Sequence, residues 1–231
     1  MNAIQLTAGK NRRYLHMDPL NIQEQLLSIR AIAQHEAAHY VAALALGFEG
    51  ADIDLHVQLE PYAHHGKARA DYSVRCESIT ELHELMTSRV IIVPSGAMGE
   101  AIDRSTFRVN ASSAYKILNE GSTGAGQDLA IAKELVNLIH NSSPMKADLE
   151  IGRDQSSGDR LTSLLGNALA LVESNAKPIC VIADALVKKV VEGKGIGDAE
   201  KCRRRKIISG YCLMNYPSLP LLVSQRVSQA V

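Results

Sequence analysis

The sequence has no tryptophan and few other aromatic residues, which together make up 4% of its 231 positions. It also has no excess of either charge, because 25 Lys and Arg residues balance 25 Asp and Glu residues. Proteins that bind single-stranded nucleic acid stack bases on aromatic side chains, and a basic surface attracts nucleic acids and anionic membranes. The composition therefore argues against a nucleic-acid partner.

Cysteines are few, and long apolar runs are absent. The four cysteines lie far apart, and none forms the Cys-x-x-Cys pair of a zinc ribbon or a redox site: Cys76, Cys180, Cys202 and Cys212. We interpret them as reduced thiols and expect a cytoplasmic protein. The longest apolar runs, such as residues 41–46 and 90–94, are far shorter than the roughly 20 residues that span a bilayer. We therefore expect neither a secretory signal nor a membrane anchor in this chain. A soluble enzyme and a binding module both remain open.

The first half of the chain shows one helical pattern and one strand pattern. Apolar residues recur at helical spacing from about Ile22 to Leu46, after a capping box formed by Asn21 and Glu24. Apolar and polar residues then alternate through residues 52–60, which predicts a half-buried strand. We expect a turn at residues 61–66 and a returning strand at residues 67–74. The predicted fold here is a long helix followed by a β-hairpin.

The second half is predicted to be helical. A capping box at Ser78 opens a helix to about Asp103, which we expect Pro94 to kink or interrupt. Residues 106–126 are polar and end in a glycine-rich loop, so we expect an irregular connection. Further helices are predicted at about residues 127–140, 160–175 and 178–192. The fold class is therefore mainly α with a small β-hairpin or sheet and a C-terminal helical part.

The sequence His35-Glu36-Ala37-Ala38-His39 lies inside the first predicted helix and matches the HExxH pattern. Residues four apart share one face of a helix, so both imidazoles can bind the same Zn²⁺. Zinc lowers the pKa of bound water to about 7, and Glu36 would accept the proton as the hydroxide attacks a peptide carbonyl. The pattern predicts zinc peptidase chemistry, with two histidines on a helix surface as the alternative. His83-Glu84 is a useful contrast, because Thr87 stands where a second ligand would be needed.

A catalytic zinc usually has three protein ligands, and the motif supplies two. A third histidine six residues after His39 is excluded, because position 45 is Ala45. The third ligand must therefore come from another segment. The residues alone leave five candidates open: Asp128, Glu100, His56, His64 and His65.

Two segments together resemble the protease domain of the FtsH-type AAA zinc metalloproteases. The segments are the helix motif at residues 35–39 and the loop Ser122-Thr123-Gly124-Ala125-Gly126-Gln127-Asp128-Leu129. The family has HEAGH followed by a TGASNDL-like segment, whose Asp is the third zinc ligand. The resemblance thus implies a zincin-like metallopeptidase domain in which His35, His39 and Asp128 bind zinc and Glu36 is the base.

The resemblance extends from about residue 31 to residue 200 and is weak outside these segments. Residues 95–100, Ser-Gly-Ala-Met-Gly-Glu, stand where the family has a GGRAAEE-like stretch. This position implies that Glu100 orients a ligand, although a surface or capping role is equally compatible. Ala38 replaces a glycine of the family, and neither its ATPase module nor its membrane anchor is found in this sequence. We divide the chain into an N-terminal arm (1–20), a metallopeptidase-like domain (21–200) and a C-terminal tail (201–231).

Three further features give weaker indications. The strand at residues 67–74 is placed where a zincin edge strand binds an extended peptide, although an ordinary paired strand is equally consistent. His64 and His65 could stabilise an oxyanion, but a pair of histidines in a turn is more often solvated. The basic run at residues 203–206 could contact an acidic partner, but a solvated helix end is the simpler interpretation.

The sequence therefore predicts a zinc-dependent endopeptidase that cleaves unfolded or flexible polypeptide segments without an ATPase of its own. The alternative is a catalytically silent, zinc-stabilised adaptor or regulatory module. Zn²⁺ is the expected cofactor and a polypeptide is the expected substrate. A homo-oligomer or a separate ATPase chain remains open as a partner.

Overall fold

The computed structural model describes residues 19–59, 62–120, 124–143 and 156–190. These parts of the chain are mainly helical, with two small antiparallel sheets. In chain order the elements are α1 (Pro19–Ala45), β1 (Glu49–Leu59), β2 (Tyr62–Asp71), α2 (Ile79–Glu100), β3 (Ile102–Asp103), β4 (Arg108–Val109), α3 (Ala111–Asn119), α4 (Gly124–Ser142), α5 (Ser157–Ser174) and α6 (Ala176–Lys189). The predicted fold class is confirmed at this level.

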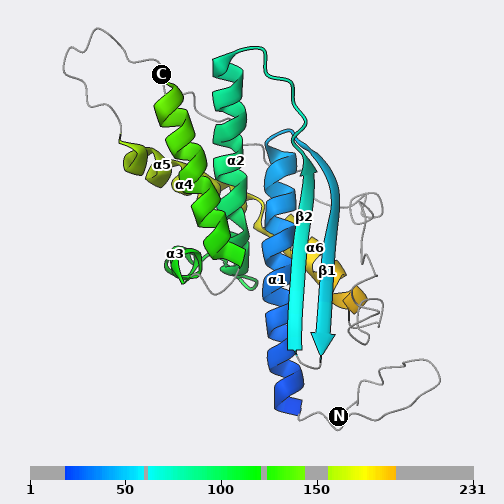
Figure 1. Ribbon diagram of the computed structural model, residues 1–231. Helices are drawn as coiled ribbons and strands as arrows, with labels where there is room; N and C mark the ends of the chain where they lie inside the picture. Colours follow the sequence, from blue (N-terminus) through cyan, green and yellow to red (C-terminus); the bar gives the residue numbers. More distant parts are fainter. Residues whose placement is uncertain (1–18, 60–61, 121–123, 144–155, 191–231) are drawn as a thin grey trace.

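The two long helices α1 and α2 form the centre of the molecule (Figure 1). The β1–β2 sheet lies along α1, and α6 also packs on α1. On the other side, α2 contacts α3, α4 and α5. Among the helices of the described ranges, none combines the length and apolarity that a membrane crossing requires. The α1–α2 pair is thus where the sheet and the later helices come together.

Strands β1 and β2 pair in an antiparallel register that runs from Glu49 opposite Asp71 to Leu59 opposite Tyr62, with an irregularity between Gly50 and Asp52. The predicted turn at residues 61–66 is therefore wrong, because β2 already begins at Tyr62. Gly66 caused this error, since glycine is a common turn residue. In the structure Gly66 lies inside the ladder opposite Leu55, where the missing side chain makes room for α1.

In the segment after β2, the expected interruption at Pro94 and the expected irregular connection at residues 106–126 are both wrong. Helix α2 is not interrupted at Pro94, which is buried inside it, because one lost backbone hydrogen bond is offset by packing against α1, α4 and α5. The predicted connection at residues 106–126 contains α3, which Asn110 caps by accepting the Ser113 N–H at 3.0 Å. Ala114 and Leu118 of α3 are buried four residues apart, which is a helical spacing that the sequence prediction overlooked.

Helix boundaries differ from the predicted ones by a few residues. Helix α1 starts at Pro19, within the predicted arm, because proline is favoured in the first turn, where a backbone N–H has no partner. Helix α2 ends at Glu100 instead of Asp103, which belongs to β3. Most of the predicted arm, the tail and the basic run at residues 203–206 lie outside the described residues.

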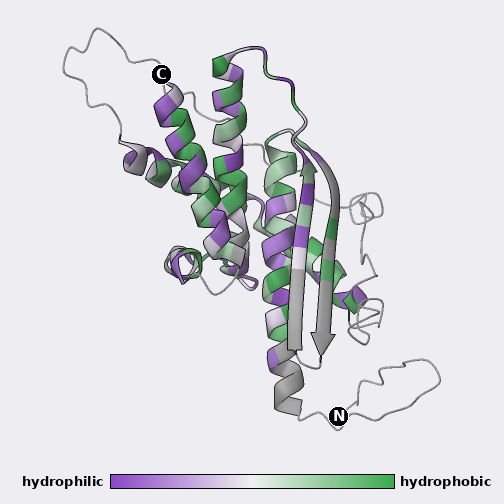
Figure 2. Cartoon of the chain, in the orientation of Figure 1, coloured by the Kyte–Doolittle hydropathy of each residue, from purple (hydrophilic) through white to green (hydrophobic). Residues whose placement is uncertain are grey.

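The core has two kinds of packing. Small side chains line the buried side of α1: Ala33, Ala37, Ala38, Ala42 and Ala43. Large side chains fill the contacts of α5 and α6: Leu171, Ile179, Ile182 and Leu186. In Figure 2, hydrophobic and hydrophilic residues alternate around α2 and α4, as expected for helices with one buried face. The small residues allow α1 to approach its neighbours closely.

Candidate metal centre

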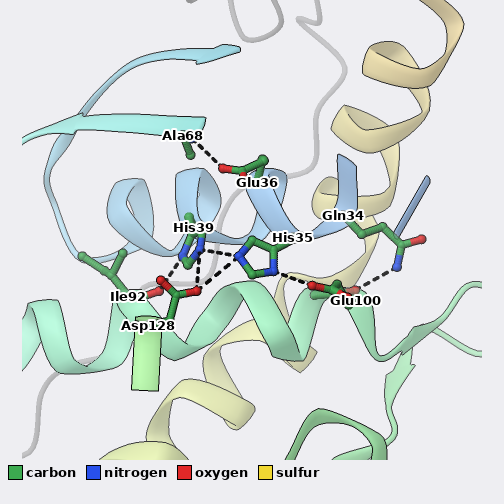
Figure 3. Close-up of polar contacts among 9 residues, drawn as sticks. Gln34, His35, Glu36, His39, Ala68, Ile92, Glu100 and Asp128 are labelled. Atoms are coloured by element: carbon green, nitrogen blue, oxygen red, sulfur yellow. Dashed lines mark hydrogen bonds and ion pairs between the residues drawn. The ribbon is translucent and has the colours of Figure 1, made fainter. Parts of the chain in front are cut away.

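His35 and His39 lie one turn apart on α1 and both point toward α2 (Figure 3). Their Nε2 atoms are 2.9 Å apart. The His35 side chain is 10% exposed and that of His39 17% exposed, so both rings are largely shielded from solvent. The helical spacing read from the sequence thus brings the two imidazoles to one point.

The other ring nitrogen of each histidine has an acceptor on α2. His39 Nδ1 donates to the Ile92 carbonyl at 3.0 Å, and His35 Nδ1 lies 2.6 Å from Glu100 Oε1. A carbonyl and a carboxylate can only accept, so each Nδ1 carries a hydrogen, and each ring would offer a lone pair at Nε2 once that nitrogen is deprotonated. Histidine ligands of metals are commonly oriented in this way. Both Nε2 atoms face the same place.

Asp128, in the first turns of α4, completes the group. Its Oδ2 lies 3.3 Å from His35 Nε2 and 3.4 Å from His39 Nε2. This oxygen is buried and has no hydrogen-bond partner among the described residues. The helix dipole at the start of α4 favours an anionic side chain there. Three possible metal-ligating atoms therefore converge, and positive charge, supplied by a proton or by a metal cation, would stabilise the group.

The pKa values of the group reflect this need for positive charge. Burial by itself would lower the pKa of His35, but contacts with Asp128 and Glu100 outweigh it and raise the pKa to about 10. Burial would raise the pKa of Asp128, but contacts with His35 and His39 lower it to about 2. A proton on His35 Nε2 and a metal cation would satisfy the same three atoms, so the two compete for the site.

The donor set and its dimensions fit a divalent transition metal. In a tetrahedral zinc site with bonds of about 2.0–2.1 Å, neighbouring ligand atoms lie about 3.3 Å apart. The three distances here are 2.9, 3.3 and 3.4 Å. His35, His39 and Asp128 are also the candidate metal-ligating group found among the described residues. The residues present therefore fit such an ion without rearrangement of the backbone.

Gly96 of α2 provides the space for an ion. A Cβ atom at this position would lie 2.4 Å from His35 Nε2 and 2.5 Å from His39 Nε2. Any side chain at position 96 would therefore fill the space beside the two Nε2 atoms. A glycine inside a helix costs about 0.5–1 kcal/mol relative to alanine, and here it is needed for the site.

Gly99 brings the two helices together one turn further along α2. A Cβ on Gly99 would lie 2.4 Å from the Ala38 Cβ and 2.6 Å from the Gln34 carbonyl oxygen. Only glycine permits this approach, which in turn places Glu100 against His35. We call the contact surface around Ala38, Gly96 and Gly99 the α1–α2 seam.

Glu36 points to the opposite side of α1, toward β2 (Figure 3). Its Oε2 accepts the backbone N–H of Ala68 at 2.6 Å, and the side chain is buried. A Cβ on Gly66 would lie 2.5 Å from Glu36 Oε1, so this glycine also makes room for the carboxylate. Glu36 is therefore fixed between α1 and β2 in this structure.

The structure brings together some of the predicted site residues and not others. Asp128 joins His35 and His39, whereas Glu100 contacts the far side of the His35 ring. His56, His64 and His65 belong to β1 and β2, where only their backbone is described. His83 bonds to Ser142 Oγ at 2.8 Å, as expected for a histidine without a second ligand.

The sequence reasoning missed the parts played by Gly96, Gly99, Gly66 and the Ile92 carbonyl. Two glycines inside a predicted helix were an available signal, since they lower helix propensity without ending the helix. Backbone carbonyls leave no signal in a sequence. No family model matches the chain, and no curated protein matches it.

Proposed function

We propose that the protein is a zinc-dependent endopeptidase with a zincin-like site. The observation that carries the proposal is the convergence of the His35 Nε2, the His39 Nε2 and the buried Asp128 Oδ2 on one point. The resemblance of residues 35–39 and 122–129 to the FtsH-type protease domain supports the same conclusion. His35, His39 and Asp128 would hold the ion.

Zinc is the metal that these donors favour. Two imidazoles and one carboxylate are typical of catalytic zinc sites, which keep the remaining position for water or substrate. Bound there, zinc would supply Lewis-acid chemistry, polarising a carbonyl and making water acidic near neutral pH. The hydrogen bonds from both Nδ1 atoms keep the imidazoles oriented for this task.

Glu36 is the proposed base. Glu36 is the carboxylate within the HExxH motif. Unlike Asp128 it does not belong to the three-atom group, and unlike Glu100 it does not contact a histidine Nδ1. Its side chain would have to leave the Ala68 N–H and turn toward the histidines before it could accept a proton from water. The proposed role therefore includes a change in the side-chain conformation of Glu36.

The proposed substrate is an extended polypeptide. The Ala68 N–H points away from β1, because it donates to Glu36 instead of to the ladder. An extended chain could pair with this N–H once the Glu36 carboxylate has turned toward the histidines, which favours flexible or unfolded segments over folded ones. The segments that carry the resemblance belong to the protease domain of the FtsH-type enzymes, so the proposal concerns peptide-bond cleavage and not ATP-driven unfolding.

The test is a comparison of the wild type with Glu36→Gln. Both proteins should bind one zinc per chain, because Glu36 is not a ligand, and only the wild type should degrade casein. Removing zinc with a chelator should abolish cleavage, and adding zinc back should restore it. If Glu36→Gln cleaves casein as fast as the wild type, Glu36 is not the base and the mechanism is wrong.

The orientation of Glu36 favours a second candidate, the catalytically silent adaptor or regulatory module. In such a module Glu36 would serve only to tie α1 to β2 through Ala68. It predicts stoichiometric metal with no turnover of any peptide by the wild type. A structure with bound zinc decides between the two, since a fourth protein ligand would favour the module.

A further inference from the structure

We infer that Gln34 is a positioning residue for the metal centre, and that Arg104 and Asp184 hold Gln34 in place. This inference rests on the metal-binding part of the proposed function. Gln34 directly precedes His35 on α1, and its side chain is buried with 3% of the residue exposed. It is bonded at both ends of its amide.

The amide nitrogen of Gln34 fixes the end of α2. It donates to the Gly99 carbonyl at 2.8 Å, one residue before Glu100. The last four carbonyls of a helix lack the partner that a further turn would supply, so this bond also satisfies the helix terminus. Two cross-links thus lie side by side, Gln34 to Gly99 and His35 to Glu100 (Figure 3).

The amide oxygen of Gln34 accepts from Arg104 Nη1 at 2.9 Å. The second guanidinium nitrogen, Nη2, bonds to Asp184 Oδ2 on α6 at 2.5 Å. A planar guanidinium can serve both acceptors at once in a fixed geometry. Arg104 therefore determines which end of the Gln34 amide faces Gly99, and it links α6 to this part of the site.

The consequence for the metal centre follows from the adjacency of these contacts. Glu100 orients the His35 ring, and its backbone position depends on Gly99. Groups that orient a metal-bound histidine directly contribute about 10- to 100-fold to metal affinity. Gln34 acts one step further away, so its removal is expected to weaken zinc affinity by about five- to tenfold.

The experiment uses the full chain with Gln34→Met, which keeps the length of the side chain and removes both hydrogen bonds. Zn²⁺ affinity is measured by competition with a chelating dye, and the visible spectrum of the Co²⁺-substituted protein reports the geometry of the ligands. Asn175→Leu is the matched control. Asn175 is also a buried amide, and it donates to the Leu171 carbonyl at 2.9 Å at the end of α5.

Gln34→Met should weaken Zn²⁺ binding and change the Co²⁺ spectrum, whereas Asn175→Leu should lower thermal stability without either change. Unchanged affinity and spectrum in Gln34→Met would overturn the inference, as would equal losses in Asn175→Leu. If Gln34→Met does not fold, Arg104→Lys decides, because the single ammonium nitrogen of lysine lacks the planar fork with which Nη1 and Nη2 reach Gln34 and Asp184. It should weaken Zn²⁺ affinity by about threefold, and unchanged affinity counts against the inference.

These readouts separate the inference from the proposed reaction. A wild type that binds zinc but cleaves nothing would remove the endopeptidase and leave the role of Gln34 intact. A wild type that binds no zinc would overturn both.

Discussion

The helices of the α1–α2 seam and those around α5 and α6 are held in position by opposite kinds of packing. In the seam, α2 can lie close to α1 only because Gly96 and Gly99 have no side chain, since a Cβ on either glycine would lie within 2.6 Å of α1. Around α6, position depends on atoms that are present, such as the fully buried Ile179 and Ile182. Adding a methyl group should therefore be harmful in the seam, and removing side-chain atoms should be harmful in the packing around α5 and α6. The three-atom group of His35, His39 and Asp128 lies at the seam.

Gly96→Ala should have the largest effect, because its methyl group would take the space beside both Nε2 atoms. We expect Zn²⁺ affinity to fall by roughly a thousandfold, beyond what loss of an orienting partner produces. Metal analysis after gel filtration checks this. The fold should survive, since alanine is a better helix former than glycine. Stoichiometric zinc in Gly96→Ala would mean that the ion lies elsewhere.

Ile182→Ala tests the other side of the comparison. Truncating this fully buried side chain should lower the free energy of unfolding by about 3 kcal/mol, through lost burial and the cavity that remains. Urea denaturation measures the loss. Zn²⁺ affinity should stay within about twofold of the wild type, since Ile182 has no polar contact with the site. A large drop in affinity would show that the two regions are not independent.

Gly99→Ala should destabilise the protein by about 2 kcal/mol, because the new methyl group meets both Ala38 and the Gln34 carbonyl. Adding Ala38→Gly removes one of these two collisions. The double variant should therefore be more stable than the sum of the single effects predicts, by about 1 kcal/mol. A double-mutant cycle of unfolding free energies gives this number directly. Strict additivity would show that the helices separate without cost.

Gly166→Ala should have the smallest effect and the opposite sign. A Cβ on Gly166 of α5 would meet no atom within 4 Å, and the residue is exposed. Alanine should therefore stabilise the helix by about 0.5–1 kcal/mol. Thermal unfolding measures the change, with zinc affinity unaltered. Destabilisation here would contradict the view that only the glycines of the seam are constrained.

The three candidate ligands differ in how far the sequence could predict that they lie together. His35 and His39 follow from helical spacing alone, since a period of 3.6 residues places them on one face. Asp128 is 89 residues beyond His39, as 128 − 39 gives, and no local pattern connects the two. Only the resemblance singled it out from the five candidates. Its position beside both rings depends on how α4 packs on α2.

The errors share a physical origin. Gly66 was interpreted as a turn residue, yet it lies in a ladder where Glu36 takes the place of a side chain. Pro94 was expected to kink or interrupt its helix, yet α2 continues through this buried residue. A sequence shows where a residue has no side chain, as at Gly66, or no backbone N–H, as at Pro94. It does not show whether the local backbone conformation or the packing of a distant segment requires that residue.

The spacing of Ile92, Gly96 and Glu100 has a consequence for folding. These residues are four apart on α2, matching the spacing of His35 and His39 on the antiparallel α1. A slip of four residues along α2, about 6 Å, would bring Ile92 or Glu100 to the position of Gly96, where the added side chain would fill the space beside both Nε2 atoms. Metal binding would then be lost. The ion would thus select one register of the helix pair, and misaligned chains would be recognisable by their failure to retain it.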